Sequence, residues 1–193
     1  MKRRCVDPYD PSVGFEGRAP VAVRGETPSD YDAIDHVVAE AFGRAEVAQM
    51  VRLIRASSNF VADLAVVAEV GGQVVGHTML SYVDVVDGGT TWPVLALSPV
   101  SVAKQAQRRG IGLALVNEVV RRADMRREPL VLVEGIPAYY PRFGFRLSTD
   151  LGIEYDLPSW APKEAGMALA LTGYDSAMRG RVVYPPAFAI AQE

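Results

Sequence analysis

Gln107-Arg108-Arg109-Gly110-Ile111-Gly112 lies between two patterned segments of the chain. An apolar, β-rich run from Pro93 to Val102 precedes it, and apolar residues follow at helical spacing: Ile111, Leu115, Val116, Val119, Val120 and Ala123. The order strand, glycine turn, helix is therefore predicted. Because glycine has no Cβ, backbone N–H groups of the turn can come close to a ligand. The first N–H groups of a helix have no partner within it and lie at its positive end, so the turn is predicted to bind an anion.

The composition predicts one domain and excludes several kinds of protein. The chain has 193 residues, of which 49% are apolar, enough for a substantial core. Its formal net charge of −3 gives no global attraction to nucleic acid or to an anionic membrane. The single cysteine, Cys5, excludes an intramolecular disulfide, and one cysteine with two histidines cannot form the usual structural zinc sites. We expect metal-free chemistry in a reducing compartment.

The N-terminal residues predict neither export nor a membrane anchor. Met1-Lys2-Arg3-Arg4 is basic, but Asp7 and Pro8 follow where a signal peptide has its apolar core. No apolar segment approaches the roughly 20 residues that cross a bilayer. We expect a cytoplasmic protein. Residues 1–20 are rich in proline, glycine and charge and are predicted to form an arm, followed by one domain over 21–193 with a C-terminal β extension over about 149–193.

Local signals divide the domain into helices and strands. Thr27, Pro28 and Asp30 predict a helix start, with Thr27 as the cap, and Gly71-Gly72 predicts a tight hairpin. Ser98-Pro99 predicts a bulge or a splay in its strand, since proline cannot donate to a ladder. Strands are predicted over 21–24, 65–70, 73–83, 93–102, 130–133, 143–147, 167–171 and 181–184, and helices over 28–42, 45–56, 110–125 and 136–141.

Spacing separates the kinds of glycine loop that bind phosphate. A P-loop needs Gly-Lys-Ser/Thr after its first glycine and four further residues, and the chain has no such sequence. A dinucleotide fingerprint needs a glycine three residues after Gly112, where this chain has Leu115. The remaining pattern, Gln-x-x-Gly-x-Gly between a strand and an amphipathic helix, resembles the acyl-CoA loop of the GNAT superfamily of N-acetyltransferases.

A second motif supports this resemblance. Ala138-Tyr-Tyr-Pro-Arg-Phe-Gly-Phe145 is similar to the family signature in which a tyrosine stands four residues before Gly-Phe. The order of predicted elements also agrees over 21–147. The sequences from Pro137 to Phe145 and from Tyr184 to Phe188 resemble those of a branch of largely uncharacterised bacterial GNAT proteins. The resemblance implies an α+β fold, the GNAT (acyl-CoA N-acyltransferase) fold, with a mixed central sheet flanked by helices and strands that splay at the acyl-CoA site.

The resemblance also implies where acetyl-CoA binds. In the family the strand before the loop pairs with the pantetheine arm through free backbone groups, which here belong to Val100, Ser101 and Val102. The N–H group of Val100 would polarise the thioester carbonyl. The pyrophosphate would be held by the N–H groups of Gln107, Arg108, Arg109, Gly110, Ile111 and Gly112. The side chains of Lys104 and Arg108 either add charge near the phosphates or are ordinary exposed cations.

Tyr140 matches the general acid of the family, since the four-residue offset to Gly144-Phe145 selects it over Tyr139. The departing thiolate has a pKa near 8.5, like that of cysteine, so a phenol with a pKa near 10 can protonate it while staying neutral at pH 7. The candidate bases are Glu134, Glu69 and His77. Glu134 follows the predicted strand over 130–133, which should splay from its neighbour. His77 lies in the middle of a predicted strand, which favours a hydrogen-bonded core residue over a base.

The predicted activity is direct transfer of an acetyl group from acetyl-CoA to a primary amine. No Gly-x-Ser-x-Gly elbow is present, and Cys5 has no histidine nearby in sequence, so a covalent enzyme intermediate is not expected. Two alternatives remain, a catalytically silent acyl-CoA-binding sensor or interaction module and a nucleotide-binding protein of another family. The acceptor pocket is expected in 44–63 and 148–175, with no motif that names the acceptor. A C-terminal edge strand would allow a homodimer.

Overall fold

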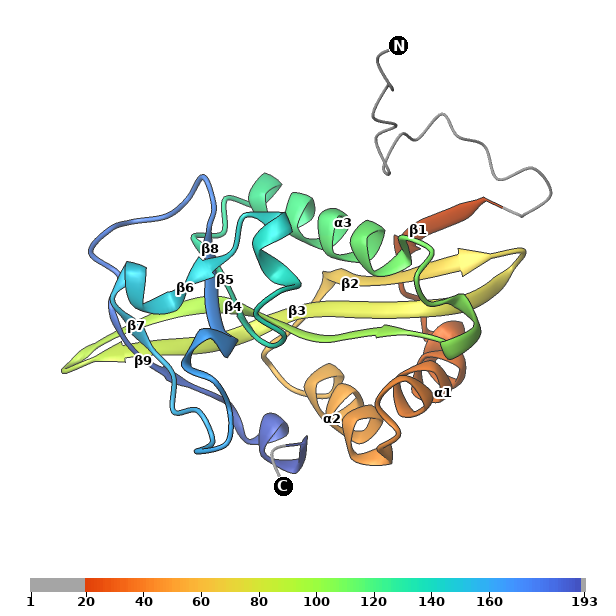
Figure 1. Cartoon of the computed structure of the whole chain (residues 1–193), viewed down its shortest axis with the longest axis horizontal. Coiled ribbons are helices and arrows are strands. Elements are labelled where there is room, and N and C mark those ends of the chain that lie inside the picture. The colour runs from red at the N-terminus through yellow and green to blue at the C-terminus, as the bar shows by residue number, and fades with distance from the viewer. Residues whose placement is uncertain (1–19, 192–193) are drawn as a thin grey trace, which may run out of the picture.

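A mixed β-sheet forms the framework of the protein (Figure 1). The computed structural model describes residues 20–191, so the predicted arm lies almost wholly outside the described residues. The main path of the sheet consists, in spatial order, of β1 (Val21–Gly25), β2 (Phe60–Val70), β3 (Gln73–Asp87), β4 (Thr90–Val102), β5 (Leu130–Glu134), β8 (Gly166–Ala170) and β6 (Arg146–Leu147). Two further strands lie off this path: β9 (Gly180–Val183) pairs with β3, and β7 (Ile153–Glu154) pairs with β9. Neighbouring strands are antiparallel except in the β4–β5 and β7–β9 pairs, which confirms the expected α+β class.

Helices cover both faces of the sheet. In Figure 1, α1 (Tyr31–Phe42) and α2 (Ala45–Arg55) lie on one face and α3 (Ile111–Met125) on the other. Successive residues of β3 serve the two faces: Met79 packs into the core beneath α1 and α2, and Leu80 into the core beneath α3. Short 3-10 helices complete the chain: η1 (Pro28–Asp30), η2 (Lys104–Ala106), η3 (Tyr140–Phe143), η4 (Ser148–Leu151), η5 (Lys163–Ala165) and η6 (Pro186–Ala191).

The local start and turn signals are confirmed. The Asp30 carboxylate accepts a hydrogen bond from the Thr27 N–H group at 2.8 Å, and η1 leads directly into α1. The β2–β3 hairpin turns at Gly71 and Gly72, whose φ angles of 59° and 80° lie in the left-handed region. These strands are longer than predicted because the ladder continues beyond the segments with clear alternation.

The predicted irregularity in β4 is also confirmed. Its register against β3 shifts between the pairs Thr78–Val100 and Leu80–Leu97, so that β4 contains one extra residue at Ser98-Pro99. On its other side β4 pairs with β5 only at Leu95–Val131 and Ala96–Leu132. The two parallel strands therefore separate just before the bulge, and a gap opens between them.

Two predictions for the segment after β5 are wrong. Residues 137–139 form a turn rather than a helix, and the helical segment is η3, further along the chain. Pro141 lies in the first turn of η3, where the N–H group that proline lacks would have no helical partner, so it starts a helix here instead of ending one. The expected strand over 143–147 shrinks to Arg146–Leu147, because Gly144, with φ of 91°, ends η3 and only then does the chain reach β8.

The C-terminal segment contains an inner strand, β9, and an edge strand, β7. β2 leaves β3 after the pair Phe60–Ser81, and β9 then takes its place along Asp84–Val86. On its other side β9 pairs with β7. The edge of this part of the sheet is therefore β7, and the homodimer stays a prediction.

Candidate active site

The gap between β4 and β5 exposes backbone groups of β4. The Ala103 N–H group donates to Val75 O at 2.9 Å, so Ala103 faces β3, and by alternation Ser101 faces β3 as well. The backbone groups of Val100 and Val102 therefore face the side from which β5 has departed. This geometry corrects the expectation that Ser101 also has free backbone groups. Its side chain points to the α1–α2 face beside His77 and is fully buried.

The glycine loop is held open by its own residues. The Gln107 side chain donates a hydrogen bond from Nε2 to Val102 O at 3.0 Å, which links the loop to the end of β4. Arg108 and Gly110 have φ angles of 60° and 78°, which turn the chain sharply into α3. The first bond of the helix ladder runs from the Ala114 N–H group to Gly110 O at 2.9 Å, so the N–H groups at 111–113 have no acceptor within the helix.

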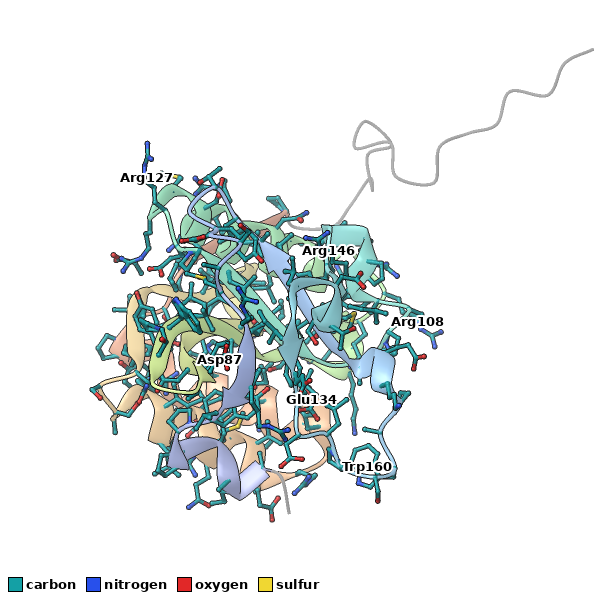
Figure 2. The ribbon with its side chains drawn as sticks, turned by 90° about the vertical axis from the view of Figure 1, so that its left-hand side faces the viewer. Asp87, Arg108, Arg127, Glu134, Arg146 and Trp160 are labelled. Carbon is teal, nitrogen blue, oxygen red and sulfur yellow. The ribbon has the colours of Figure 1, made fainter. Side chains whose placement is uncertain are left out.

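A cavity of about 700 Å³ lies between this loop, the splayed strands, α1–α2 and the C-terminal segment. It brings together six of the predicted site residues: Val100, Val102, Gln107, Gly112, Glu134 and Tyr140. The others, Ser101, Arg108, Arg109, Gly110 and Ile111, do not line it. Figure 2 shows Arg108 projecting from the edge of the molecule, away from Glu134.

Tyr140 is fixed in the cavity wall by other aromatic rings and by a glycine. Its ring centroid lies 5.1 Å from that of Tyr139 and 5.7 Å from that of Phe145, both edge-on. A Cβ on Gly135 would lie 2.5 Å from Cε2 of Tyr140, so the ring occupies space that only glycine leaves. Burial, with a smaller contribution from Tyr139, raises the pKa of Tyr140 to about 12.

Tyr139 has a different position from its neighbour. A Cβ on Gly112 would lie 2.8 Å from the Tyr139 hydroxyl oxygen, so this side chain reaches the glycine loop. The Arg142 guanidinium lies over the Tyr139 ring at 4.7 Å and donates from Nε to Tyr139 O at 2.8 Å. Tyr139 thus belongs to the wall between the loop and the Tyr140 ring.

Glu134 ends β5 where the gap has opened, and its exposed side chain lines the cavity. Partial burial raises the pKa of its carboxyl group above the usual value. Burial and the charge of Glu134 raise the pKa values of Tyr155 and Tyr184, so both neighbouring phenols stay neutral. Within residues 20–191 the Glu134 carboxylate forms no ion pair.

The other two candidate bases lie elsewhere. Glu69 accepts hydrogen bonds from Arg24 at 2.9 and 3.1 Å on the β1–β2 side of the sheet. His77 is fully buried, and its Nε2 lies 3.0 Å from Oε2 of Glu26, which Arg55 also binds, at 2.8 and 2.9 Å. The interpretation of His77 as a hydrogen-bonded core residue is confirmed. Neither side chain lines the cavity.

The far wall of the cavity was only half predicted. Arg44, Val47 and Met50 line it, in agreement with the expected range 44–63. No residue of 148–175 does so, and the opposite wall instead comes from Tyr184, Phe188 and Ala191. Figure 1 shows this C-terminal segment returning beside α2. The sequence did not predict this wall because it joins α1 and α2 to residues near the other end of the chain, and no local sequence pattern indicates such a contact.

Residues 20–191 contain neither a metal-binding cluster nor a membrane-spanning helix. No group of three or more His, Cys, Asp or Glu side chains is placed to hold a metal ion. In the same part of the chain, no helix is both long enough and apolar enough to span a membrane.

Comparison with known proteins gives one consistent match. The family model of the acetyltransferase (GNAT) domain matches residues 22–148. The uncharacterised N-acetyltransferase YhbS of Escherichia coli K12 is 29% identical over 126 residues, which cover 65% of this chain and 74% of YhbS. The crystal structure of E. coli YhbS in complex with CoA has a TM-score of 0.79 at 26% identity and covers 88% of this chain and 92% of that one. A GNAT acetyltransferase of Brucella melitensis in complex with acetyl-CoA has a TM-score of 0.71 at 28% identity and covers 88% and 99%. The bulged strand, the glycine loop at the start of α3 and the gap between β4 and β5 thus belong to a fold shared with acetyltransferases, and the chain is a member of the GNAT acetyltransferase family.

Proposed function

We propose that the protein transfers an acetyl group from the thioester of acetyl-CoA directly to a primary amine. The observation that carries this proposal is the gap between β4 and β5. The free backbone groups of Val100, the phenol of Tyr140 and the carboxylate of Glu134 all border the cavity into which the gap opens. The relatives solved with CoA and acetyl-CoA support the choice of donor.

The residues present fit acetyl-CoA. The unpaired N–H groups at the start of α3 suit a pyrophosphate, and Gly112 leaves their approach free of a Cβ. The outward backbone groups of Val100 and the N–H group of Val102 suit the amides of a pantetheine arm laid along β4, whereas Val102 O already accepts from Gln107 Nε2. Ser101 contributes no backbone group on this side, because its groups face β3. The side chains of Arg108 and Arg109 do not line the cavity, so the loop acts mainly through its backbone.

The chemistry divides among three groups of the chain. Glu134 accepts the proton that the amine must lose before its nitrogen can attack. The Val100 N–H group donates to the thioester oxygen as negative charge develops there. A C–N bond forms, the C–S bond breaks, and Tyr140 donates its hydroxyl hydrogen to the departing sulfur. The nitrogen loses a second proton as the amide forms, which restores the Tyr140 hydroxyl group, and Glu134 releases its proton to solvent. The products are an N-acetylated amine and free CoA.

The pKa of Tyr140 defines what this phenol can do. A pKa of about 12 keeps the Tyr140 phenol protonated at neutral pH, so it can donate a hydrogen bond throughout this range. The pKa of Tyr140 in the free protein is roughly 3 to 4 units above the thiol pKa of about 8.5, so full proton transfer from Tyr140 to the thiolate is unfavourable by that amount. A sulfur bound beside the same apolar rings would also have its pKa raised, which narrows this difference. Tyr140 therefore acts first as a hydrogen-bond donor to the leaving sulfur.

Substitution Tyr140→Phe tests the proposal. We expect kcat to fall by about 10²- to 10⁴-fold, the usual contribution of general acid catalysis, with acetyl-CoA affinity retained. Release of CoA measured against a panel of amines gives the rate, and calorimetry gives the affinity. Tyr174→Phe is the matched control, since Tyr174 is partly buried and does not line the cavity. A protein that binds acetyl-CoA and acetylates no amine would be the silent sensor, and the proposal would fail.

A further inference from the structure

The half of the cavity beyond the splayed strands has an apolar and aromatic wall. Phe42 at the end of α1 and Val47 and Met50 on α2 form one side. Tyr184 and Phe188 form the other, with ring centroids 5.0 Å apart and planes tilted by 36°. Such a wall favours a ligand with an apolar body over one covered by polar groups.

The two sides are joined across the chain. Arg44, between α1 and α2, donates from Nη1 to Ala191 O at 3.3 Å, so the loop between the helices is tied to the end of η6. Phe188 is buried in the core that α2 also helps to build. The cavity is thus bounded on this side.

The charge in the cavity is equally restricted. Among the described residues that line it, Glu134 is the one carboxylate and Arg44 the one cation. The Arg44 guanidinium is engaged by Ala191 O and, more loosely, by the Glu46 carboxylate at 3.9 Å. Tyr155 and Tyr184 stand near Glu134 as neutral phenols, and Tyr155 donates to Met167 O at 3.2 Å. Within residues 20–191 the cavity therefore offers one negative charge, that of Glu134.

On the basis of the proposed function, we propose that the acceptor is a primary monoamine whose amino group is attached to an apolar, preferably aromatic, body. Its single ammonium group matches the single carboxylate, Glu134, which takes the proton before the nitrogen attacks. The body of the amine would lie against the rings of Phe42 and Phe188. A polyamine or an aminoglycoside would bring further ammonium groups. These groups would lose their bound water on entering the cavity without gaining a carboxylate partner among the described residues. A peptide would likewise leave backbone amides unpaired against the apolar wall.

A panel of amines tests this assignment with the full chain and acetyl-CoA. The panel is 2-phenylethylamine, ethylamine, spermidine, kanamycin and a lysine-containing peptide, with CoA release as the readout. We expect kcat/KM for 2-phenylethylamine to exceed that for ethylamine by about 100-fold, from burial of the ring, and to exceed those for spermidine, kanamycin and the peptide. If any of these three is the best acceptor, the assignment is wrong and the transferase proposal stands. If acetyl-CoA binds but no amine is acetylated, the transferase proposal fails and the assignment with it.

A pair of variants locates the effect in this wall. Phe42 and Leu53 are large apolar side chains that are 46% and 41% exposed, so removing either leaves the core intact. Only Phe42 lines the cavity. Phe42→Ala should lower kcat/KM for 2-phenylethylamine by roughly tenfold more than it lowers the value for ethylamine, whereas Leu53→Ala should change neither. Equal losses for both amines in Phe42→Ala would show that the ring does not contact the acceptor body and would overturn the assignment.

Discussion

The substitution Gly135→Ala separates the position of the Tyr140 hydroxyl from its presence. Gly135 follows β5, and its N–H group donates to Ala165 O at 3.0 Å. Its φ angle is not positive, so alanine suits the backbone at this site. The added Cβ would lie 2.5, 3.3 and 3.4 Å from Cε2, Cζ and Cδ2 of Tyr140. The ring must therefore move while its hydroxyl group remains.

The size of the effect follows from these distances. Ordinary contact begins at 3.4 Å, so the ring must retreat by about 0.9 Å from its present position. A displacement of about 1 Å at a reacting group costs on the order of 10²-fold in rate, equivalent to about 2.7 kcal/mol in the activation barrier. The added Cβ meets Tyr140 and not the glycine loop at the start of α3, so under the proposed function the affinity for acetyl-CoA should change little.

Four variants complete the experiment: Gly135→Ala, Tyr140→Phe, the double variant of both, and Gly89→Ala as control. A Cβ on Gly89 would meet no atom within 4 Å, so this control should match the parent protein. If both changes act on one hydroxyl group, the double variant should be no slower than Tyr140→Phe alone. Thermal unfolding checks that each variant folds. Losses that simply add in the double variant, or an unchanged kcat in Gly135→Ala, would refute the placement of Tyr140 at the reacting sulfur.

Two further predictions concern the glycine loop and the buried histidine. Gly112→Ala places a Cβ 2.8 Å from the Tyr139 hydroxyl oxygen and crowds the N–H groups at the start of α3. Calorimetry should therefore show that the affinity for acetyl-CoA falls by tenfold or more, which corresponds to the loss of one hydrogen bond to a charged group. Unchanged affinity would exclude this loop as the anion site. Burial lowers the pKa of His77, although Glu26 opposes this, so below the ordinary histidine pKa of about 6.5 the unfolded chain binds a proton that the folded chain does not. Stability should therefore fall from pH 7 to pH 5, by at most about 1.4 kcal/mol per pH unit, and thermal unfolding of His77→Gln should show a shallower slope; an identical slope would assign the pH dependence to other groups.

Local signals in the sequence were sufficient for most elements of the fold. Caps, glycine pairs and helical spacing act within a few residues, so Thr27-Pro28, Gly71-Gly72 and the α3 pattern could be read directly. Ser98-Pro99 also marked the bulge, since proline affects the ladder wherever it occurs. The short elements after β5 were misplaced because a proline can begin or limit a helix, and only the packing around Tyr140 decides between the two.

The site was less predictable where it depends on pairing between distant segments. The alternation that turns Ser101 toward β3 requires the register of the ladder, which the sequence does not state. The binding of Arg55 and His77 by Glu26 joins a loop, a helix and a strand. The Phe188 wall depends on where β9 enters the sheet. Each of these contacts is specified by tertiary packing and leaves no periodic trace in the chain.

The place of β9 beside β3 has a consequence for any attempt to alter the acceptor. The strand that delivers Tyr184 and Phe188 to the cavity also supplies the ladder partners of Asp84–Val86. A chain truncated before Gly180 would lose the acceptor wall and would also expose an unpaired strand edge, a surface prone to aggregation. Acceptor preference can therefore be re-engineered by exchanging side chains of η6 and α2, but not by grafting or deleting the C-terminal segment as a detachable module.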